Sequence, residues 1–259
     1  EVAQKLMAQR SRLKRSVLIL GFDAEEKGLM GAKYFVDHPT VDLKNIVAML
    51  NMDMIGRMED SIANAGGVGT SPLFESMLDS LTQDQEFSLT MTKPGFGPSD
   101  HAAFYAKDIP VLFFFSGSHQ DYHTPEDDSY KINYAGLKNI SEIVYNVVFD
   151  VANRSDNFVF QEAGTKEQSG GRRRFKVTLG ILPDYTYHES PGLRVDGVLD
   201  GRPAKKAGMK KGDIITAIDD EIVGDIYDYM YRLEKLKAGQ KISVDVLRDG
   251  KKIVLSVDL

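Results

Sequence analysis

Hydrophobic and polar positions alternate along residues 1–153 in a way that predicts short buried strands separated by amphipathic helices. Short continuous apolar runs indicate strands, and apolar positions three and four residues apart indicate helices. We expect strands at 16–22, 46–54, 87–91 and 110–115, and helices at 2–12, 28–37, 71–84, 99–106 and 133–153. This alternation predicts an α/β domain in which helices sandwich a mixed sheet.

The pattern changes after residue 153. Residues 154–171 are polar and rich in Ser, Gly, Gln and Glu, which predicts a linker. Residues 172–259 contain short strand patterns punctuated by glycines. Within them, Asp249-Gly250 joins two alternating runs at 241–247 and 251–257, and Asp-Gly in this position is a strong hairpin signal. The second half therefore predicts a small, mostly β domain.

One helix is expected in that small domain, over residues 225–236. Its apolar residues recur at the spacing that places them on one face of a helix. They are Ile226, Tyr229, Met230, Leu233 and Leu236. We expect this face to be buried.

Composition narrows the classes of partner. The net charge of -6 and the pI near 5.5 argue against a nucleic-acid partner, which requires clustered Lys and Arg. The apolar runs are far shorter than the roughly 18 to 20 residues of a membrane-spanning helix. The chain contains no cysteine, so carboxylates and imidazoles are its strong metal donors.

The first residues read as the middle of an amphipathic helix. Residues 1–6 contain neither an initiator methionine nor the apolar core of a signal peptide. We therefore interpret the chain as a part of a longer protein.

Acidic residues follow two of the predicted strands. Glu25 and Glu26 come after the strand expected at 16–22, and Asp53 lies near the end of the strand expected at 46–54. The carboxyl ends of strands in open α/β sheets form the ligand crevice, and adjacent carboxylates there can divide metal binding and proton transfer. A solvated helix face for the glutamates, and a salt bridge with Arg57 for Asp53, are the alternatives.

A third strand end offers an imidazole. His123 follows the apolar run 110–115 after a polar loop, and Tyr122 precedes it directly. A single histidine on a loop is weak evidence for metal binding, but three separated strand ends then each carry a donor. We interpret His101, His119 and His188 as residues that do not bind metal.

Three motifs resemble the co-catalytic zinc aminopeptidase family. They are Gly-Phe-Asp-Ala-Glu-Glu-Lys-Gly-Leu-Met-Gly at 21–31, Asn-Met-Asp-Met-Ile-Gly at 51–56 and Tyr-His-Thr-Pro at 122–125. Ser99-Asp100-His101 followed by Phe104 also resembles that family's pattern.

The resemblance implies a role for each candidate residue. Glu25 is the expected general base, and Tyr122 is expected to donate a hydrogen bond to the developing oxyanion. Glu26 and His123 are expected to bind one zinc ion, and Asp53 the other. Asp127 is expected either to support the site by shaping its loop or simply to belong to a Thr-Pro-Glu-Asp turn.

Two ligands of the family pattern are missing. The family also uses a histidine and a metal-bridging aspartate upstream of the glutamate pair, whereas residues 1–24 contain no histidine, and their acidic residues are Glu1 and Asp23. We expect two zinc ions in the full-length protein. We expect the 259-residue chain alone to bind zinc weakly and to be inactive.

Residues 173–259 resemble a PDZ domain of the bacterial protease type. The resemblance rests on Leu-Gly-Ile at 179–181, on the Pro-Ala to Gly-Asp-Ile-Ile stretch at 203–215 and on Arg-Asp-Gly at 248–250. It implies that a peptide adds as a strand after Leu179, Gly180 and Ile181, with its terminal carboxylate on backbone N–H groups. The alternative is a groove filled by the chain's own Pro183, Tyr185 and Tyr187.

The resemblances lead to one main functional hypothesis and two alternatives. The main hypothesis is a periplasmic or secreted zinc aminopeptidase that acts on peptide substrates and carries a PDZ domain for peptide binding or regulation. The first alternative is a transferase that resembles glutaminyl cyclase and uses a single zinc ion. The second is a non-catalytic scaffold whose PDZ domain binds peptides.

Overall fold

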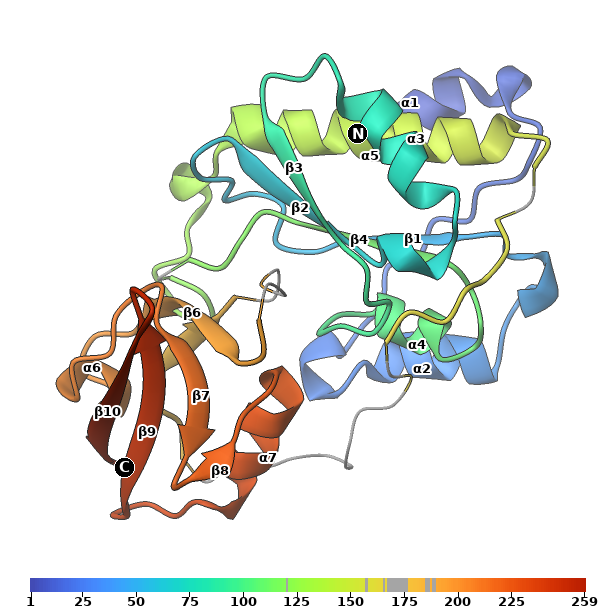
Figure 1. The fold of residues 1–259 in the computed structure, drawn as a ribbon. Helices are drawn as coiled ribbons and strands as arrows, with labels where there is room; N and C mark the ends of the chain where they lie inside the picture. Colours follow the sequence, from blue (N-terminus) through green and yellow to red (C-terminus); the bar gives the residue numbers. More distant parts are fainter. Residues whose placement is uncertain (120, 157, 165, 167–176, 185–186, 188–189) are drawn as a thin grey trace. The chain divides into compact units, whose positions relative to one another are not determined.

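The computed structural model describes the chain in two compact units (Figure 1). The first unit comprises residues 1–117 and 129–167, and the second comprises 118–128 and 168–259. The structure describes residues 1–259 except 120, 157, 165, 167–176, 185–186 and 188–189. Much of the predicted linker, the first residues of the predicted second domain, Tyr185 and His188 therefore lie outside the described residues.

The N-terminal unit is built on a four-stranded mixed sheet. Its strands are β1 (Met49–Met52), β2 (Ile62–Gly66), β3 (Ser88–Thr92) and β4 (Val111–Phe115), in the order β1-β4-β2-β3. The β1–β4 and β2–β3 pairs are parallel, and the β2–β4 pair is antiparallel. β4 is buried along its whole length, as its Val-Leu-Phe-Phe-Phe sequence predicts for a strand covered on both faces.

Helices cover both faces of this sheet. α1 (Val2–Ala8), α3 (Phe74–Thr82) and α5 (Tyr134–Asn153) lie on one face, and α2 (Met30–Asp37) and α4 (His101–Tyr105) lie on the other (Figure 1). Each helical layer closes its own hydrophobic core against the sheet. Short 3₁₀ turns occur at Arg10–Arg12, Glu25–Lys27, Leu43–Asn45, Val68–Thr70 and Ser129–Lys131. No helix in the described part of the chain combines the length and the apolar character needed to cross a membrane. The predicted fold class is confirmed.

The strand predicted at 16–22 is wrong. This segment has no strand structure, and its side chains Leu18, Ile19 and Leu20 are 49%, 64% and 37% exposed. A strand exists only when a neighbour supplies backbone partners, and no described strand pairs with this segment. The apolar run 16–22 has the composition of a strand, but composition does not show whether another strand lies beside it to form hydrogen bonds. Only its last residue, Phe22, packs into the core, where its ring lies 5.9 Å from that of Phe35.

The sequence prediction missed β2. Its sequence, Ile-Ala-Asn-Ala-Gly, is dominated by residues that are depleted in strands, so propensity gave no signal. Ala63 and Ala65 are nevertheless 1% and 0% exposed, because β2 is an inner strand between β4 and β3 and its small side chains pack into the hydrophobic core. Tertiary packing overrides local propensity at this strand.

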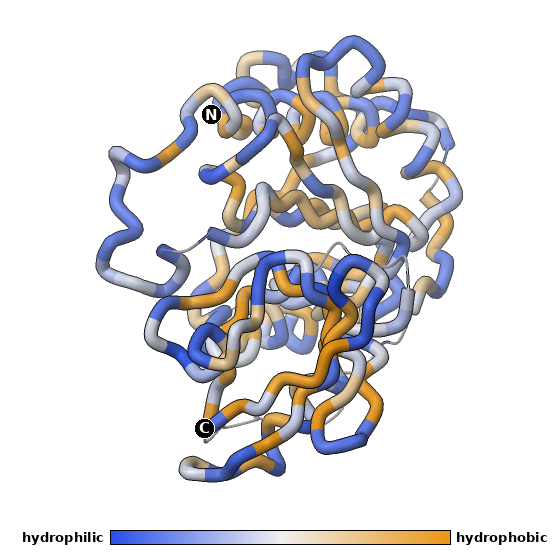
Figure 2. Tube along the Cα trace, turned by 60° about the vertical axis from the view of Figure 1, so that its left-hand side comes forward, coloured by the Kyte–Doolittle hydropathy of each residue, from blue (hydrophilic) through white to orange (hydrophobic). Residues whose placement is uncertain are grey.

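The C-terminal unit contains an antiparallel sheet. Its strands are β5 (Ile181–Pro183), β6 (Leu193–Val198), β7 (Ile214–Ile218), β9 (Lys241–Arg248) and β10 (Lys251–Asp258), in the order β10-β9-β7-β6-β5. The hairpin predicted around Asp249-Gly250 is confirmed, because Arg248 pairs with Lys251. The strands of this unit carry long hydrophobic stretches (Figure 2).

Short elements complete this unit. They are α6 (Pro203–Lys206), β8 (Glu221–Ile222) and α7 (Ile226–Lys235). On α7 and just beyond it, Tyr229, Leu233 and Leu236 are 5%, 5% and 6% exposed and belong to the core, and Ile226 and Met230 pack against it. The predicted buried face of this helix is confirmed.

A buried ion pair ties β7 to the β9–β10 hairpin. Asp213 is 1% exposed, and its two carboxylate oxygens each accept a 2.7 Å hydrogen bond from the Arg248 guanidinium. The backbone N–H of Lys210 donates to the same carboxylate at 2.9 Å. Removal of the Asp213 charge would weaken both charge-assisted hydrogen bonds to the buried carboxylate, although the Arg248 side chain, 22% exposed, keeps contact with water.

We therefore predict that Asp213→Asn destabilises the C-terminal unit by about 3 kcal/mol. Hydrogen exchange of the β7 and β9 amides across a urea series measures this free energy of opening locally, without interference from the N-terminal unit. Asp258→Asn is the matched control, because its 3.7 Å contact with Lys241 is largely exposed. Equal protection in the two variants would contradict a structural role for the buried pair.

Candidate active site

The glutamate pair lies on a tight turn that leads into α2. Ala24 and Leu29 have φ angles of 56° and 59°, and Gly28 has a φ of 97°. The Glu25 carbonyl accepts hydrogen bonds from the N–H groups of Gly28 and Leu29, at 2.9 and 2.8 Å. This turn replaces the strand-to-helix junction that the sequence predicted. It holds the backbone of Glu25 and Glu26 in a defined conformation.

Asp53 directly follows β1, as predicted. Its backbone N–H donates to the Phe114 carbonyl at 3.2 Å, which continues the ladder with β4 by one residue. Its carboxylate accepts a 2.9 Å hydrogen bond from the Ser99 hydroxyl, which in turn accepts one from the Asn51 side-chain amide at 2.7 Å. Within the described part of the chain, no Lys or Arg forms an ion pair with Asp53.

Ser99 is a functional candidate that the residue-level prediction missed. It is 2% exposed, and its hydroxyl joins β1 to the start of α4 by the two hydrogen bonds just described. The sequence did contain a sign of this residue, because Ser99 is the first residue of the Ser-Asp-His motif at 99–101. Its role as the partner of Asp53 required the fold, since 46 residues separate the two.

Four carboxylates influence one another in this region. Partial burial, followed by the negative charges of Glu26, Asp53 and Asp100, raises the pKa of Glu25 to about 7. Burial and the charge of Asp53 also raise the pKa of Asp100. A cation is favoured here, because it would offset the negative charges that raise the pKa values of Glu25 and Asp100.

Asp100 is the second residue that the site prediction did not include. Although Asp100 begins α4, its side chain makes no capping hydrogen bond, and its buried Oδ1 has no hydrogen-bond partner among the described residues. A buried carboxylate oxygen without a donor is expensive. This atom and the charge cluster around it fit a site that receives a divalent cation.

His101, interpreted from sequence as a residue that does not bind metal, is packed against the sheet. The side chain is 2% exposed and its ring stacks on Phe113 at 4.5 Å. Burial lowers the pKa of His101 to about 3, so the ring is neutral at ordinary pH. Its position supports a packing role on the sheet.

Tyr122 and His123 lie next to each other in the segment 118–128, which belongs to the C-terminal unit. The two rings stack with centroids 3.8 Å apart, and His123 has a φ of 58°. The structure therefore presents the predicted site residues as two groups. One is the acidic cluster of the N-terminal unit, and the other is this ring pair.

The same segment contains a second set of donors. His119, Asp121 and Asp127 each offer a ligand atom, and these atoms lie within 4.8 Å of one another. His119 was interpreted from sequence as a residue that does not bind metal, and Asp127 as a supporting or turn residue. The sequence prediction did not include Asp121.

The predicted peptide site of the C-terminal unit begins at Leu179. This residue is 0% exposed, Gly180 has a φ of 75°, and Ile181 opens β5. β5 stands at one end of the sheet, so its outer edge has no described neighbour and is open to an added strand. A Cβ on Gly180 would lie 2.2 Å from Cβ of Arg202, so this position requires glycine for space as well as for backbone conformation.

Tyr187, one of the residues that could fill the peptide groove of this unit, lies among the described residues, and its contacts are with Ser190 and Arg194. The Tyr187 hydroxyl lies 2.7 Å from that of Ser190, and its ring lies 5.5 Å from the guanidinium of Arg194 on β6.

Comparison with known protein families identifies both halves of the chain. Residues 1–148, more than half of the chain, match the model of peptidase family M28. The chain belongs to peptidase family M28. Residues 173–259 match the model of the PDZ domain, so a PDZ domain follows the M28 domain. The predicted family and the predicted order of the two domains are confirmed.

The two domains of this chain are similar to two different kinds of protein. Aminopeptidase YwaD of Bacillus subtilis is 26% identical over 151 residues, which are 54% of this chain and 33% of the relative. A probable periplasmic serine endoprotease, DegP-like, of Marinomonas is 37% identical over 79 residues, which are 30% of this chain and 17% of that protein. The solved structure of a zinc aminopeptidase from Bacillus subtilis is 25% identical, with a TM-score of 0.45, and the match covers 56% of this chain and 38% of that one. The chain thus spans about a third or less of the length of the curated relatives cited here.

The pKa of Glu25 provides a direct test of the acidic cluster in the M28 domain. In the metal-free chain we expect the Glu25 carboxyl to titrate near pH 7, and Asp53→Asn to lower its pKa because one neighbouring negative charge is removed. Addition of zinc is expected to lower the pKa as well. Side-chain carboxyl NMR across a pH series measures both effects, and Glu86→Gln, an exposed loop variant, is the control. A Glu25 pKa of about 4.5 that none of these changes moves would contradict the cluster.

Proposed function

We propose that this M28 domain belongs to a zinc-dependent aminopeptidase that removes N-terminal residues from peptides. The observation that carries the proposal is the acidic cluster, in which Glu25 is poised to exchange a proton near neutral pH beside Glu26, Asp53 and Asp100. The family membership and the names of the aminopeptidase relatives support the reaction class. The name of a structural relative supports zinc as the metal.

Each residue has a defined part in the proposed reaction. Glu26 and His123 hold one zinc ion, and Asp53 holds the other, while Ser99 orients the Asp53 carboxylate through its hydrogen bond. Bound zinc lowers the pKa of a water molecule and polarises the carbonyl of the scissile peptide bond. Glu25 accepts the proton of the attacking water and passes it to the leaving amine.

Glu25 suits this role because of its environment. A general base is most effective when its pKa lies near the working pH, and partial burial together with three acidic neighbours moves Glu25 in that direction. Positive charge at the metal positions lowers the pKa of Glu25 again, so the glutamate is ionised when it has to accept a proton. Tyr122 stabilises the negative charge that develops on the substrate oxygen by donating its hydroxyl proton in a hydrogen bond.

The number of protein ligands available to each zinc ion indicates how well the 259-residue chain can bind zinc. A catalytic zinc usually has about three protein ligands, and the proposed assignment supplies two for one ion and one for the other. We therefore propose that this chain alone binds zinc weakly at this site and hydrolyses peptides little. A zinc-dependent aminopeptidase activity of the isolated chain would contradict this part of the proposal.

The PDZ domain is proposed to bind peptide C-termini or to regulate the peptidase. The free edge of β5 and the glycine conformation at Gly180 support peptide binding by strand addition. The periplasmic protease named among the PDZ relatives supports a periplasmic or secreted location for the whole protein.

We predict that Glu25→Gln lowers kcat for aminoacyl amides by at least a hundredfold in an active, zinc-loaded preparation, with KM and zinc content almost unchanged. Gln keeps the size of the side chain but cannot accept the proton. Steady-state kinetics and metal analysis on the same sample separate loss of the base from loss of zinc. Glu86→Gln is the control, and a Glu25→Gln enzyme with full kcat would exclude Glu25 as the base.

We predict that a labelled peptide with a free, apolar C-terminus binds the PDZ domain at least tenfold more tightly than its C-terminally amidated form. Gly180→Ala is expected to weaken binding by a similar factor, because the added methyl group meets Arg202. Gly239→Ala is the matched control, since Gly239 also has a positive φ, of 80°, but open space at its Cβ. Fluorescence anisotropy reports the affinities, and equal binding of both peptide forms would overturn carboxylate recognition.

A further inference from the structure

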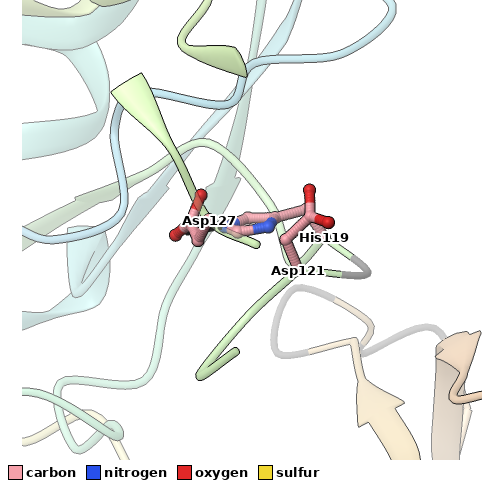
Figure 3. Close-up of side chains that lie close together, drawn as sticks. All are labelled: His119, Asp121 and Asp127. Carbon is pink, nitrogen blue, oxygen red and sulfur yellow. Dashed lines mark ion pairs between the residues drawn. The ribbon is translucent and has the colours of Figure 1, made fainter. Parts of the chain in front are cut away.

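A group of metal-type donors lies in the segment 118–128, apart from the residues assigned above to zinc. Its members are His119, Asp121 and Asp127, whose side chains converge in Figure 3. Each offers one ligand atom within 4.8 Å of the other two. Imidazole nitrogen and carboxylate oxygen are the donors that zinc and similar divalent metals take in sites without cysteine.

The spacing within the group suits an ion better than direct contact. His119 Nε2 lies 3.7 Å from Asp127 Oδ2, which is longer than a hydrogen bond between these atoms. Donors around one metal ion are separated by roughly 3 to 4 Å, given bonds of about 2.0–2.2 Å to each. Side-chain movements of about 1 Å or less would therefore bring all three donors to one ion.

Burial and charge point in the same direction. The His119 ring is buried, Asp121 is half-buried and Asp127 is exposed, so the group has a protein side and a side open to water ligands. The segment 118–128 carries four carboxylates and no Lys or Arg. A divalent cation is attracted to a segment of this composition.

The backbone already folds the three donors toward one another. The Tyr122 N–H donates to the His119 carbonyl at 3.1 Å, and the Thr124 N–H donates to the Asp121 carbonyl at 3.0 Å. The Asp127 N–H then donates to the Thr124 carbonyl at 3.3 Å. These successive turns reduce the ordering cost that an ion would otherwise have to offset on binding.

We propose that His119, Asp121 and Asp127 bind one divalent transition-metal ion of the zinc class, with a set of ligands that shares no residue with Glu26, Asp53 and His123. Tyr122 and His123 lie between these ligands in the chain. The ion therefore cross-links the two ends of the loop that carries both rings and restricts their positions. This role is structural and does not depend on the proposed peptidase reaction.

The test is zinc binding by the 259-residue chain, measured by equilibrium dialysis with metal analysis and by titration calorimetry. The variants His119→Gln, Asp121→Asn and Asp127→Asn each remove one donor. Asp128→Asn is the matched control, because it removes the same charge from an exposed neighbour outside the group. Asp53→Asn separates this site from the proposed catalytic one.

Each donor variant is expected to weaken binding of one zinc ion at least tenfold, while Asp128→Asn and Asp53→Asn retain that ion with unchanged affinity. An equal loss in Asp128→Asn would reduce the effect to general charge attraction and overturn the site. Unchanged zinc binding in all three donor variants would overturn it as well. Loss of the ion in Asp53→Asn would assign it to the acidic cluster instead.

Nitrogen-15 NMR of the histidine rings detects zinc at His119 directly. This measurement does not depend on how stable each variant is. Zinc is expected to shift a ring nitrogen of His119, identified by its absence in His119→Gln, and Asp127→Asn is expected to suppress that shift. If His119→Gln fails to fold, the Asp127→Asn and Asp128→Asn pair still carries the test. A zinc titration that leaves the His119 nitrogens unmoved would refute the proposal.

Discussion

The mutual repulsion of carboxylates is the constraint on which the N-terminal unit depends. The charges of Glu26, Asp53 and Asp100 help to raise the pKa of Glu25, the charge of Asp53 helps to raise that of Asp100, and one oxygen of Asp100 is buried without a hydrogen bond among the described residues. Such an arrangement lowers the stability of the metal-free protein, because each charge is placed where another already lies. Proteins keep strained groups of this kind where a ligand relieves the strain, and a cation is the ligand that would do so here.

The sheet provides the framework that holds these acids together. The parallel β1–β4 pair continues into the hydrogen bond from Asp53 to Phe114, which fixes the backbone of the aspartate just past the end of β1. Ser99, at the entrance to α4, then fixes its side chain. The position of this acidic group therefore follows from contacts with a neutral backbone and a neutral hydroxyl.

The C-terminal unit handles a buried acid in the opposite way. Asp213 is almost fully buried, yet a two-pronged contact with Arg248 and one backbone N–H occupy its oxygens. This aspartate is satisfied within the protein and serves the fold. Asp53 and Asp100 differ from Asp213 in two respects: they are only partly buried, and no Lys or Arg among the described residues forms an ion pair with them.

The sequence by itself determined the features that depend on short-range chemistry. The Asp249-Gly250 hairpin, the buried face of α7, the apolar strand β4 and the motifs of the two families all follow from residues close together in the chain. Turn chemistry and helical periodicity are local properties, so a single sequence is sufficient to predict them.

Only the tertiary structure decided the features that depend on a partner. The segment 16–22 has the composition of a strand but no strand beside it, whereas β2 has a poor strand composition and is held by β3 and β4. Ser99 and Asp100 lie beside Asp53, 46 and 47 residues away in sequence, through contacts that sequence spacing does not encode. Backbone pairing and the sharing of a buried charge both require two segments to meet, and the fold alone specifies which segments do so.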